Sequence, residues 1–115
     1  MEIRRIDTTA KLSKVVVANG FAFISGQVGK SCDASARTQA EEIFAKADGY
    51  LAQAGTSKDK LVSATVWVKD LNELPEINAA WEAWIPNGTA PSRSCVQSTP
   101  ASSQFAVAIA FVATL

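Results

Sequence analysis

Asn19-Gly20 lies between two runs of β-forming residues, and this arrangement restricts the fold of the chain more than any other feature. The runs 14–18 and 21–25 are rich in valine, phenylalanine and isoleucine. Asn-Gly is a preferred sequence for two-residue hairpin turns because both residues tolerate positive φ. The sequence therefore predicts an antiparallel hairpin, and a weaker alternation over residues 2–6 predicts an edge strand beside it.

A helix that packs by one side only is predicted from Ala40 to Ala54. We expect Thr38 and Glu41 to form a capping box at its start and Gly55 to end it. The apolar residues that fall on one helical face are Ile43, Phe44, Ala47, Leu51 and Ala54.

A second helix is predicted to follow Asn72, which we expect to cap it, with Pro75 in the first turn. The expected buried stripe of this helix consists of Leu74, Ile77, Trp81, Trp84 and Ile85. We interpret the tryptophans as core residues, because large aromatic side chains are mostly buried.

Three further segments, 61–69, 93–97 and 105–113, are predicted strands. The residues of the first that are expected to share one face are Val62, Ala64, Val66 and Val68. In the last, bulky residues alternate with Ala106, Ala108 and Ala110, so one face is nearly bare. Three strands, a helix, a strand, a helix and two strands in this order predict an α+β fold, with two helices covering one face of a mixed sheet.

The composition predicts a single domain over residues 1–115. The net charge is zero, whereas a nucleic-acid-binding protein needs clustered positive charge, so we expect no nucleic-acid partner. The chain has no histidine and no Cys-x-x-Cys pair, so we expect no metal site and free thiols at Cys32 and Cys95. No signal sequence is apparent and the longest apolar run, 105–113, is too short to span a bilayer, which predicts a cytoplasmic protein without membrane contact.

Arg93 is the only charged side chain between Ala83 and Leu115. An arginine stays protonated and offers a planar fork of donors that matches a carboxylate or phosphate. Two interpretations remain open at this point. Arg93 binds an anionic ligand, or it is structural and either pairs with an acid of the chain or points into solvent.

Three motifs occur in a characteristic order along the chain. Ile24-Ser25-Gly26-Gln27-Val28 follows the hairpin, Asn78 lies in the second helix, and Pro91-Ser92-Arg93-Ser94-Cys95-Val96 enters a later strand. In this order and spacing the chain resembles the RidA (YjgF) family over essentially its whole length. The resemblance implies a chorismate-mutase-like fold and a homotrimer with clefts between subunits. It also implies, for active members, hydrolysis of reactive enamines and imines to 2-keto acids and ammonia without a cofactor.

The resemblance further implies a set of site residues. It makes Arg93 the catalytic residue that holds the substrate carboxylate. The other substrate-binding residues that it implies are Cys95, Asn78, Ser25, Gly26 and Gln27.

Each of these residues also has a structural interpretation. Cys95 is expected on the same strand face as Arg93, but we prefer to interpret it as a small buried hydrophobic residue. Asn78 either supports the cleft or satisfies buried backbone. Gly26 would let the backbone approach substrate, while Ser25 and Gln27 could simply tie their turn together.

Two positions depart from the family pattern. A glutamate that places or activates the hydrolytic water aligns with Ala108, and a tyrosine aligns with Leu12. Neither alanine nor leucine moves a proton, so catalysis would be weak unless Glu41, Glu42 or a bound water compensates.

Three functional hypotheses follow. The first is a trimer that binds a small carboxylate or imino acid and deaminates enamines or imines. The second is a non-catalytic ligand-binding or regulatory trimer with the same pocket. The third is an endoribonuclease, against which the neutral charge and the absence of histidine argue.

Overall fold

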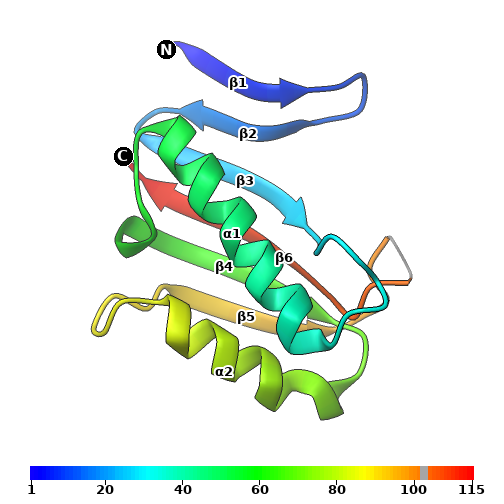
Figure 1. The fold of residues 1–115 in the computed structure, drawn as a ribbon. Helices are drawn as coiled ribbons and strands as arrows, with labels where there is room; N and C mark the ends of the chain where they lie inside the picture. The colour runs from blue at the N-terminus through cyan, green and yellow to red at the C-terminus, as the bar shows by residue number, and fades with distance from the viewer. Residues whose placement is uncertain (102–103) are drawn as a thin grey trace.

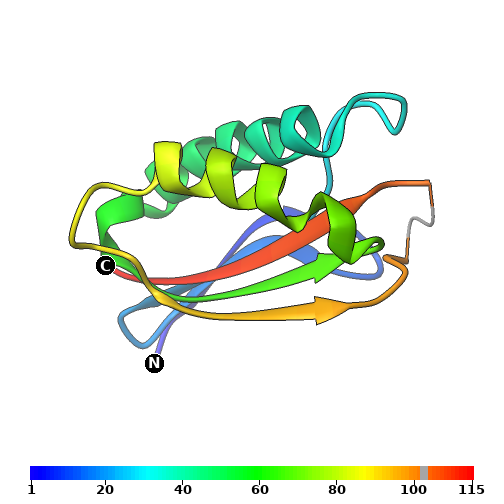
Figure 2. The same cartoon turned by 90° about the horizontal axis from the view of Figure 1, so that it is seen from below.

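A single mixed sheet organises the fold (Figure 1). The computed structural model describes residues 1–101 and 104–115, and their strands form one six-stranded sheet in the order β1-β2-β3-β6-β4-β5. The strands are β1 (Ile3–Thr8), β2 (Ser13–Ala18), β3 (Phe21–Gln27), β4 (Leu61–Val68), β5 (Ser92–Gln97) and β6 (Val107–Thr114). The β4–β5 pair is parallel and the other pairs are antiparallel. Helices α1 (Ala36–Ala54) and α2 (Leu74–Trp84) form one layer on one face of the sheet (Figure 2), which confirms the predicted α+β class.

The β2–β3 hairpin turns at Asn19-Gly20 as predicted. Asn19 has φ 51° and Gly20 has φ 83°, and Ala18 pairs directly with Phe21. Positive φ at both central residues matches the right-handed twist of the flanking strands, which is why this turn suits a hairpin. β1 pairs antiparallel with β2 at the edge of the sheet.

Helix α1 begins earlier than the sequence pattern predicts. Ser35 is its N-cap, and the Ser35 hydroxyl accepts a hydrogen bond from the backbone N–H of Thr38 at 3.1 Å. The predicted Thr38–Glu41 capping box is therefore wrong, because the Ser35 side chain is the capping acceptor and the helix already begins at Ala36. Gly55 ends the helix in the left-handed conformation as predicted, with φ 88°.

Helix α2 is preceded by a short 3-10 turn, η2 (Leu71–Glu73). The carboxylate of Asp70 accepts from the backbone N–H of Asn72 at 2.9 Å and caps this turn. Asn72 is therefore not the N-cap of α2, because it lies inside η2, and Glu73 occupies the N-cap position of α2 without a side-chain hydrogen bond. Pro75 does lie in the first turn of the helix. Within the described chain, neither helix is long and apolar enough to cross a membrane.

Two strand predictions are wrong for reasons of register. The β4–β6 pairing shifts between Leu61 and Ser63, so Leu61 is buried and Val62 is exposed, contrary to the simple alternation. β6 starts at Val107 rather than at residue 105. The backbone N–H of Ala106 donates to the side chain of Gln39 at 2.9 Å, so a helix residue holds this segment where the strand was predicted to begin.

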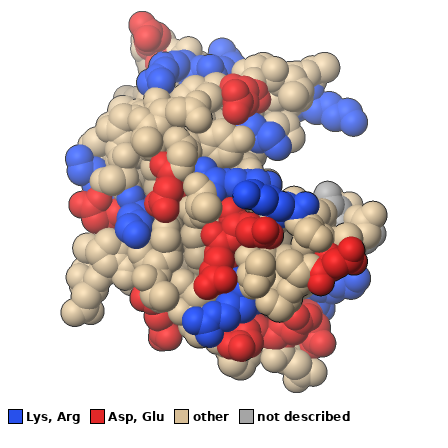
Figure 3. Space-filling model, in the orientation of Figure 1, with Lys and Arg blue, Asp and Glu red and all other residues tan. Residues whose placement is uncertain are grey.

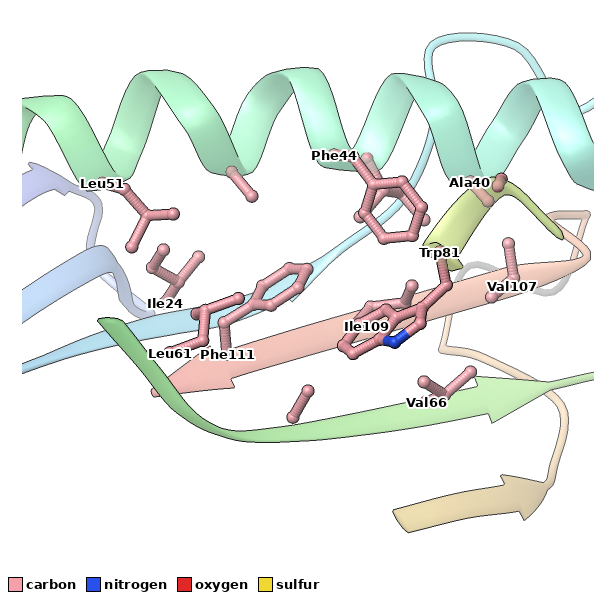
Figure 4. Close-up of a cluster of buried hydrophobic side chains, with 14 of the residues drawn as sticks. Ile24, Ala40, Phe44, Leu51, Leu61, Val66, Trp81, Val107, Ile109 and Phe111 are labelled. Atoms are coloured by element: carbon pink, nitrogen blue, oxygen red, sulfur yellow. The ribbon is translucent and has the colours of Figure 1, made fainter. Parts of the chain in front are cut away.

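The core fills the space between the sheet and the two helices (Figure 4). Val107, Ile109 and Phe111 point toward the helices, and all three are buried. Trp81 is buried as predicted and meets Phe44 of α1 edge-to-face, with 5.8 Å between ring centroids. Trp84 is only half-buried, and its indole N–H donates to the Asp48 carboxylate.

The opposite face of the sheet, which we call the open face, carries neither helix and exposes several large apolar side chains. Its residues include Phe21, Phe23, Thr65, Trp67, Val96, Ala108 and Ala110. Phe23 is 45% exposed, whereas its strand neighbours Ala22 and Ile24 point into the core. The side that carries the helices is different in character, because basic and acidic side chains intermingle over it (Figure 3).

Candidate functional site

Arg93 lies on β5 and extends toward helix α2. Its register partner on β4 is Ala64, which is buried in the core, so both side chains point to the helix side of the sheet. One terminal nitrogen, Nη2, donates to Oδ1 of Asn78 at 2.8 Å. The guanidinium carbon lies 5.1 Å from the centroid of a Trp81 ring, within cation–π range. Two residues of α2 therefore orient a half-buried guanidinium.

The positive charge of Arg93 has no carboxylate partner among residues 1–101 and 104–115. The two side-chain ion pairs between described residues both involve Arg37 instead. The other terminal nitrogen of Arg93, Nη1, is buried and has no hydrogen-bond acceptor. Such a group costs about 1–3 kcal/mol, and more when it is charged. Neither structural alternative for Arg93, an internal ion pair or a solvent-exposed side chain, describes this environment.

Cys95 lies on the same side of β5 as Arg93, as predicted from the two-residue spacing. Its register partner is Val66, another core residue. The thiol is nevertheless exposed at the edge of the sheet, so the interpretation of Cys95 as a small buried hydrophobe is wrong for the single chain. Cys32 is exposed as well, and both cysteines are free.

A hollow of about 430 Å³ lies at the end of the sheet where β3 and β4 finish and β6 begins. Gly26 and Gln27 of β3 line it together with Trp67 and Ala108, which are register partners on the open face. The segment 98–101 after β5 forms another wall. Lys14 from β2 and Lys46 from α1 also line the hollow, and they are its charged residues in the described chain.

The Ser25-Gly26-Gln27 motif is part of β3 rather than a turn. The β3–β6 register shifts between Ile24 and Gln27, so the motif forms an irregularity at the end of the strand. The Gln27 side-chain amide donates to the Ser25 carbonyl at 2.9 Å and lies 3.2 Å from the Ser25 hydroxyl. These bonds tie the segment together, as the alternative interpretation holds. A Cβ added at Gly26 would lie 3.7 Å from the Trp67 ring, which is ordinary van der Waals contact.

The predicted site residues form two groups that do not meet within one chain. Arg93 and Asn78 lie together on the helix side of the sheet. Gly26, Gln27 and Ala108 line the hollow, whereas Arg93 does not. Sequence order could not reveal this separation, because the side of a sheet on which a residue lies depends on strand register.

No acidic side chain among the described residues lines the hollow. Ala108, where the family resemblance implies a glutamate, is 9% exposed and lines the hollow with a methyl group. Glu41 pairs with Arg37 at 3.8 Å and Glu42 accepts from the backbone N–H of Lys30 at 3.0 Å, so both candidate replacements are engaged elsewhere. Leu12 lies exposed in the turn before β2. In the part of the chain that the structure describes, no cluster of three or more His, Cys, Asp or Glu residues could hold a metal.

Lys14 and Lys46 are the charged lining residues of the described chain that sequence reasoning missed. Lys14 alternates with buried Val15 on β2, and Lys46 lies on the flank of α1 between core positions. In the sequence both look like ordinary solvated lysines. Their convergence on one hollow depends on how α1 lies across the sheet.

Comparisons with known proteins agree with this architecture. The family model described as "Endoribonuclease L-PSP" matches residues 2–115. The "RutC family protein YoaB" of Escherichia coli K12 is 35% identical over 113 residues, which cover 98% of each chain. NMB1025 from Neisseria meningitidis, described as a member of the YjgF protein family, has a crystal structure and is 33% identical in sequence. The two structures superpose with a TM-score of 0.95 over 99% of this chain and 95% of the NMB1025 chain. A protein of the conserved Rid family from Yersinia pestis, YyfA, is 24% identical and shares the fold with a TM-score of 0.87, covering 94% of this chain and 90% of its own. These neighbours are consistent with the chorismate-mutase-like fold.

Proposed function

The chain belongs to the YjgF/RidA family, and from that premise we propose that it binds a small carboxylate or imino acid and hydrolyses reactive enamines or imines to 2-keto acids and ammonia. In this proposal it acts as a homotrimer in the cytoplasm, without a metal or cofactor, a nucleic-acid partner or a membrane. The environment of Arg93 carries the proposal.

Arg93 has the properties of a carboxylate anchor. Asn78 and the Trp81 ring hold the guanidinium in place, which lowers the entropy lost when a ligand binds. No carboxylate among the described residues neutralises it, and Nη1 lacks an acceptor. A ligand carboxylate that reached the guanidinium would supply both the charge and the acceptor in one planar, bidentate contact.

The proposed reaction needs only water. A 2-aminoenoate first tautomerises to its 2-imino acid by moving one proton from nitrogen to carbon. Water then adds to the imine carbon, both of its protons pass in turn to nitrogen, and the C–N bond breaks to give the 2-keto acid and ammonia. Arg93 would hold the carboxylate through these steps, and the backbone of the Gly26-Gln27 segment would border the reacting carbon.

Assembly of three chains is part of the proposal, because Arg93 and the hollow are separate within one chain. The open face exposes Phe21, Phe23 and Val96, and such apolar surface favours association. Contact between copies through this face would bury it. It would also allow Arg93 of one copy to approach the hollow of the next, which is the inter-subunit cleft that the family resemblance implies.

A non-catalytic ligand-binding trimer is the second candidate, and one observation favours it. The described lining of the hollow has no carboxylate, and Ala108 occupies the position of the family's water-activating glutamate. General acid–base assistance contributes about 10²–10⁴ in rate, so a site without it would bind ligand but hydrolyse slowly.

The experiment that tests the proposal measures 2-keto acid release from freshly generated imino acids, with the uncatalysed rate as reference. The wild-type chain is expected to accelerate release, and Arg93→Ala is expected to lower kcat/KM by at least about 30-fold, since truncating one partner of a buried charged pair costs about 2–5 kcal/mol. Arg37→Ala, which removes an exposed surface arginine, serves as the matched control and should retain activity. A wild-type rate equal to that of buffer, with 2-keto acids still bound at Arg93, would select the non-catalytic candidate instead.

A further inference from the structure

The hollow beside Trp67 has an unbalanced positive charge. Lys14 and Lys46 line it, and the residues of the described chain that share the lining include neither aspartate nor glutamate. Two ammonium groups that share a hollow repel one another where no anion lies between them. The face that carries the helices differs from this lining, because basic and acidic side chains intermingle on it (Figure 3).

Both lysines retain donors for a ligand. The Lys46 ammonium donates one hydrogen bond, to the Val28 carbonyl at 2.7 Å, and two of its three protons remain. That bond also fixes the ammonium at the wall of the hollow. Lys14 has no hydrogen bond or ion pair with any residue in the two described ranges, 1–101 and 104–115. An anionic group placed between the two would accept several charge-assisted hydrogen bonds.

The rest of the hollow suits a small organic molecule better than a bare ion. Trp67, Val28, Pro100 and Ala108 contribute apolar surface, and the hydroxyl residues Ser98 and Thr99 lie at one wall. A volume of about 430 Å³ falls within the range of small-molecule sites, in which a few polar groups orient a mostly apolar body.

We propose that Lys14 and Lys46 bind a second anionic group of the ligand, so that this protein prefers dianionic 2-keto or 2-imino acids over monocarboxylates. The inference rests on the proposed function, which assigns the first carboxylate to Arg93. The second group is a carboxylate or a phosphate, since both accept hydrogen bonds from an ammonium pair. Lys14 and Lys46 are thus specificity-determining residues.

Calorimetric titration with matched ligands tests the proposal. 2-Oxopentanoate and 2-oxoglutarate have the same chain length and differ by a methyl group in place of a carboxylate, and phosphohydroxypyruvate presents a phosphate as its second anion. The wild-type protein is expected to bind a dianion at least about tenfold more tightly than 2-oxopentanoate. This ratio corresponds to the lower end of the free energy that a hydrogen bond to a charged group contributes. The dianion that binds more tightly identifies the second group as carboxylate or phosphate.

Lysine variants connect the preference to the hollow. Lys14→Met removes an ammonium group that has no hydrogen bond or ion pair with a described residue, and Lys46→Gln removes the charge but keeps a donor for the Val28 carbonyl. Each should lower the affinity for dianions far more than the affinity for 2-oxopentanoate, and so remove most of the dianion preference. Lys60→Met, which removes an exposed lysine outside the hollow, should keep the preference. Equal wild-type affinities for all three ligands, or a preference that survives in both variants, would overturn the inference.

Arg93→Ala separates this inference from the proposed function. Loss of binding of every ligand in that variant supports both. If dianions still bind and still require the lysines, the hollow is an anion site and the assignment of Arg93 is wrong. If 2-oxopentanoate binding requires Arg93 but dianions bind no more tightly than 2-oxopentanoate, the proposed function stands and the proposed role of the two lysines is wrong.

Discussion

Replacing Gln39 with leucine should destabilise the protein, because this buried glutamine joins three parts of the backbone. Its side chain is 1% exposed on helix α1. The amide donates to the carbonyls of Ala34 at 2.9 Å and Cys32 at 3.3 Å, and its oxygen accepts from the backbone N–H of Ala106 at 2.9 Å. Gln39 therefore holds the loop before α1 against the segment that leads into β6.

The magnitude follows from which groups lose a partner. Leucine has nearly the same volume but no polar atom, so three backbone groups lose a hydrogen bond. The N–H of Ala106 has no other acceptor among residues 1–101 and 104–115, and leaving such a group unpaired costs about 1–3 kcal/mol. The carbonyls of Cys32 and Ala34 lie nearer to solvent, where water can replace the lost partner. The loss of each of these two hydrogen bonds therefore costs only about 0.5–1 kcal/mol of stability. We expect Gln39→Leu to lower the free energy of unfolding by roughly 2–5 kcal/mol.

Urea unfolding followed by tryptophan fluorescence measures this difference. Gln53→Leu is the matched control, because it makes the same substitution on the exposed side of the same helix, and we expect it to change stability by less than about 0.5 kcal/mol. An unchanged urea slope would show that the loss belongs to the folded state. Equal midpoints for the two variants would refute the reasoning, since the bonds of Gln39 would then contribute no more than a surface side chain.

Two further predictions concern catalysis and assembly. Ala108→Glu places a carboxylate in the hollow with Lys14 and Lys46 as partners, and should raise imine hydrolysis about 10²-fold in the 2-keto acid assay; an unchanged rate would mean that water is activated elsewhere. Phe23→Asp puts a charge on the open face and should convert a trimer to a monomer by light scattering, whereas Leu71→Asp, at a similarly exposed position on η2, should leave the mass unchanged. A wild-type monomer at micromolar concentration would contradict the second prediction and remove the shared cleft.

Much of the fold could be predicted because it depends on residues that are close in sequence. The positive φ angles at Asn19-Gly20, the stripe of α1 and its end at Gly55 all follow from local preferences. The element boundaries were less predictable. Ser35 and Thr38 both can cap a helix, as can Asp70 and Asn72, and the choice depends on where the incoming chain must turn to reach the sheet.

The candidate site was predictable only in part. The isolation of Arg93 in the sequence pointed to a charge without a partner, and the structure describes such a charge beside Asn78. The hollow could not be derived in this way. Lys14 and Lys46 are 32 positions apart on different elements, and no pattern along the chain links them.

The sequence by itself determined the class of fold and the type of each element, because periodicity and turn chemistry act over a few residues. Only the tertiary structure decided that Val62 is exposed, that Arg93 and the hollow lie apart, and that two lysines line one hollow with Trp67. The physical reason is that one shifted residue in a strand reverses its faces, and that register is set by packing between segments distant in the chain.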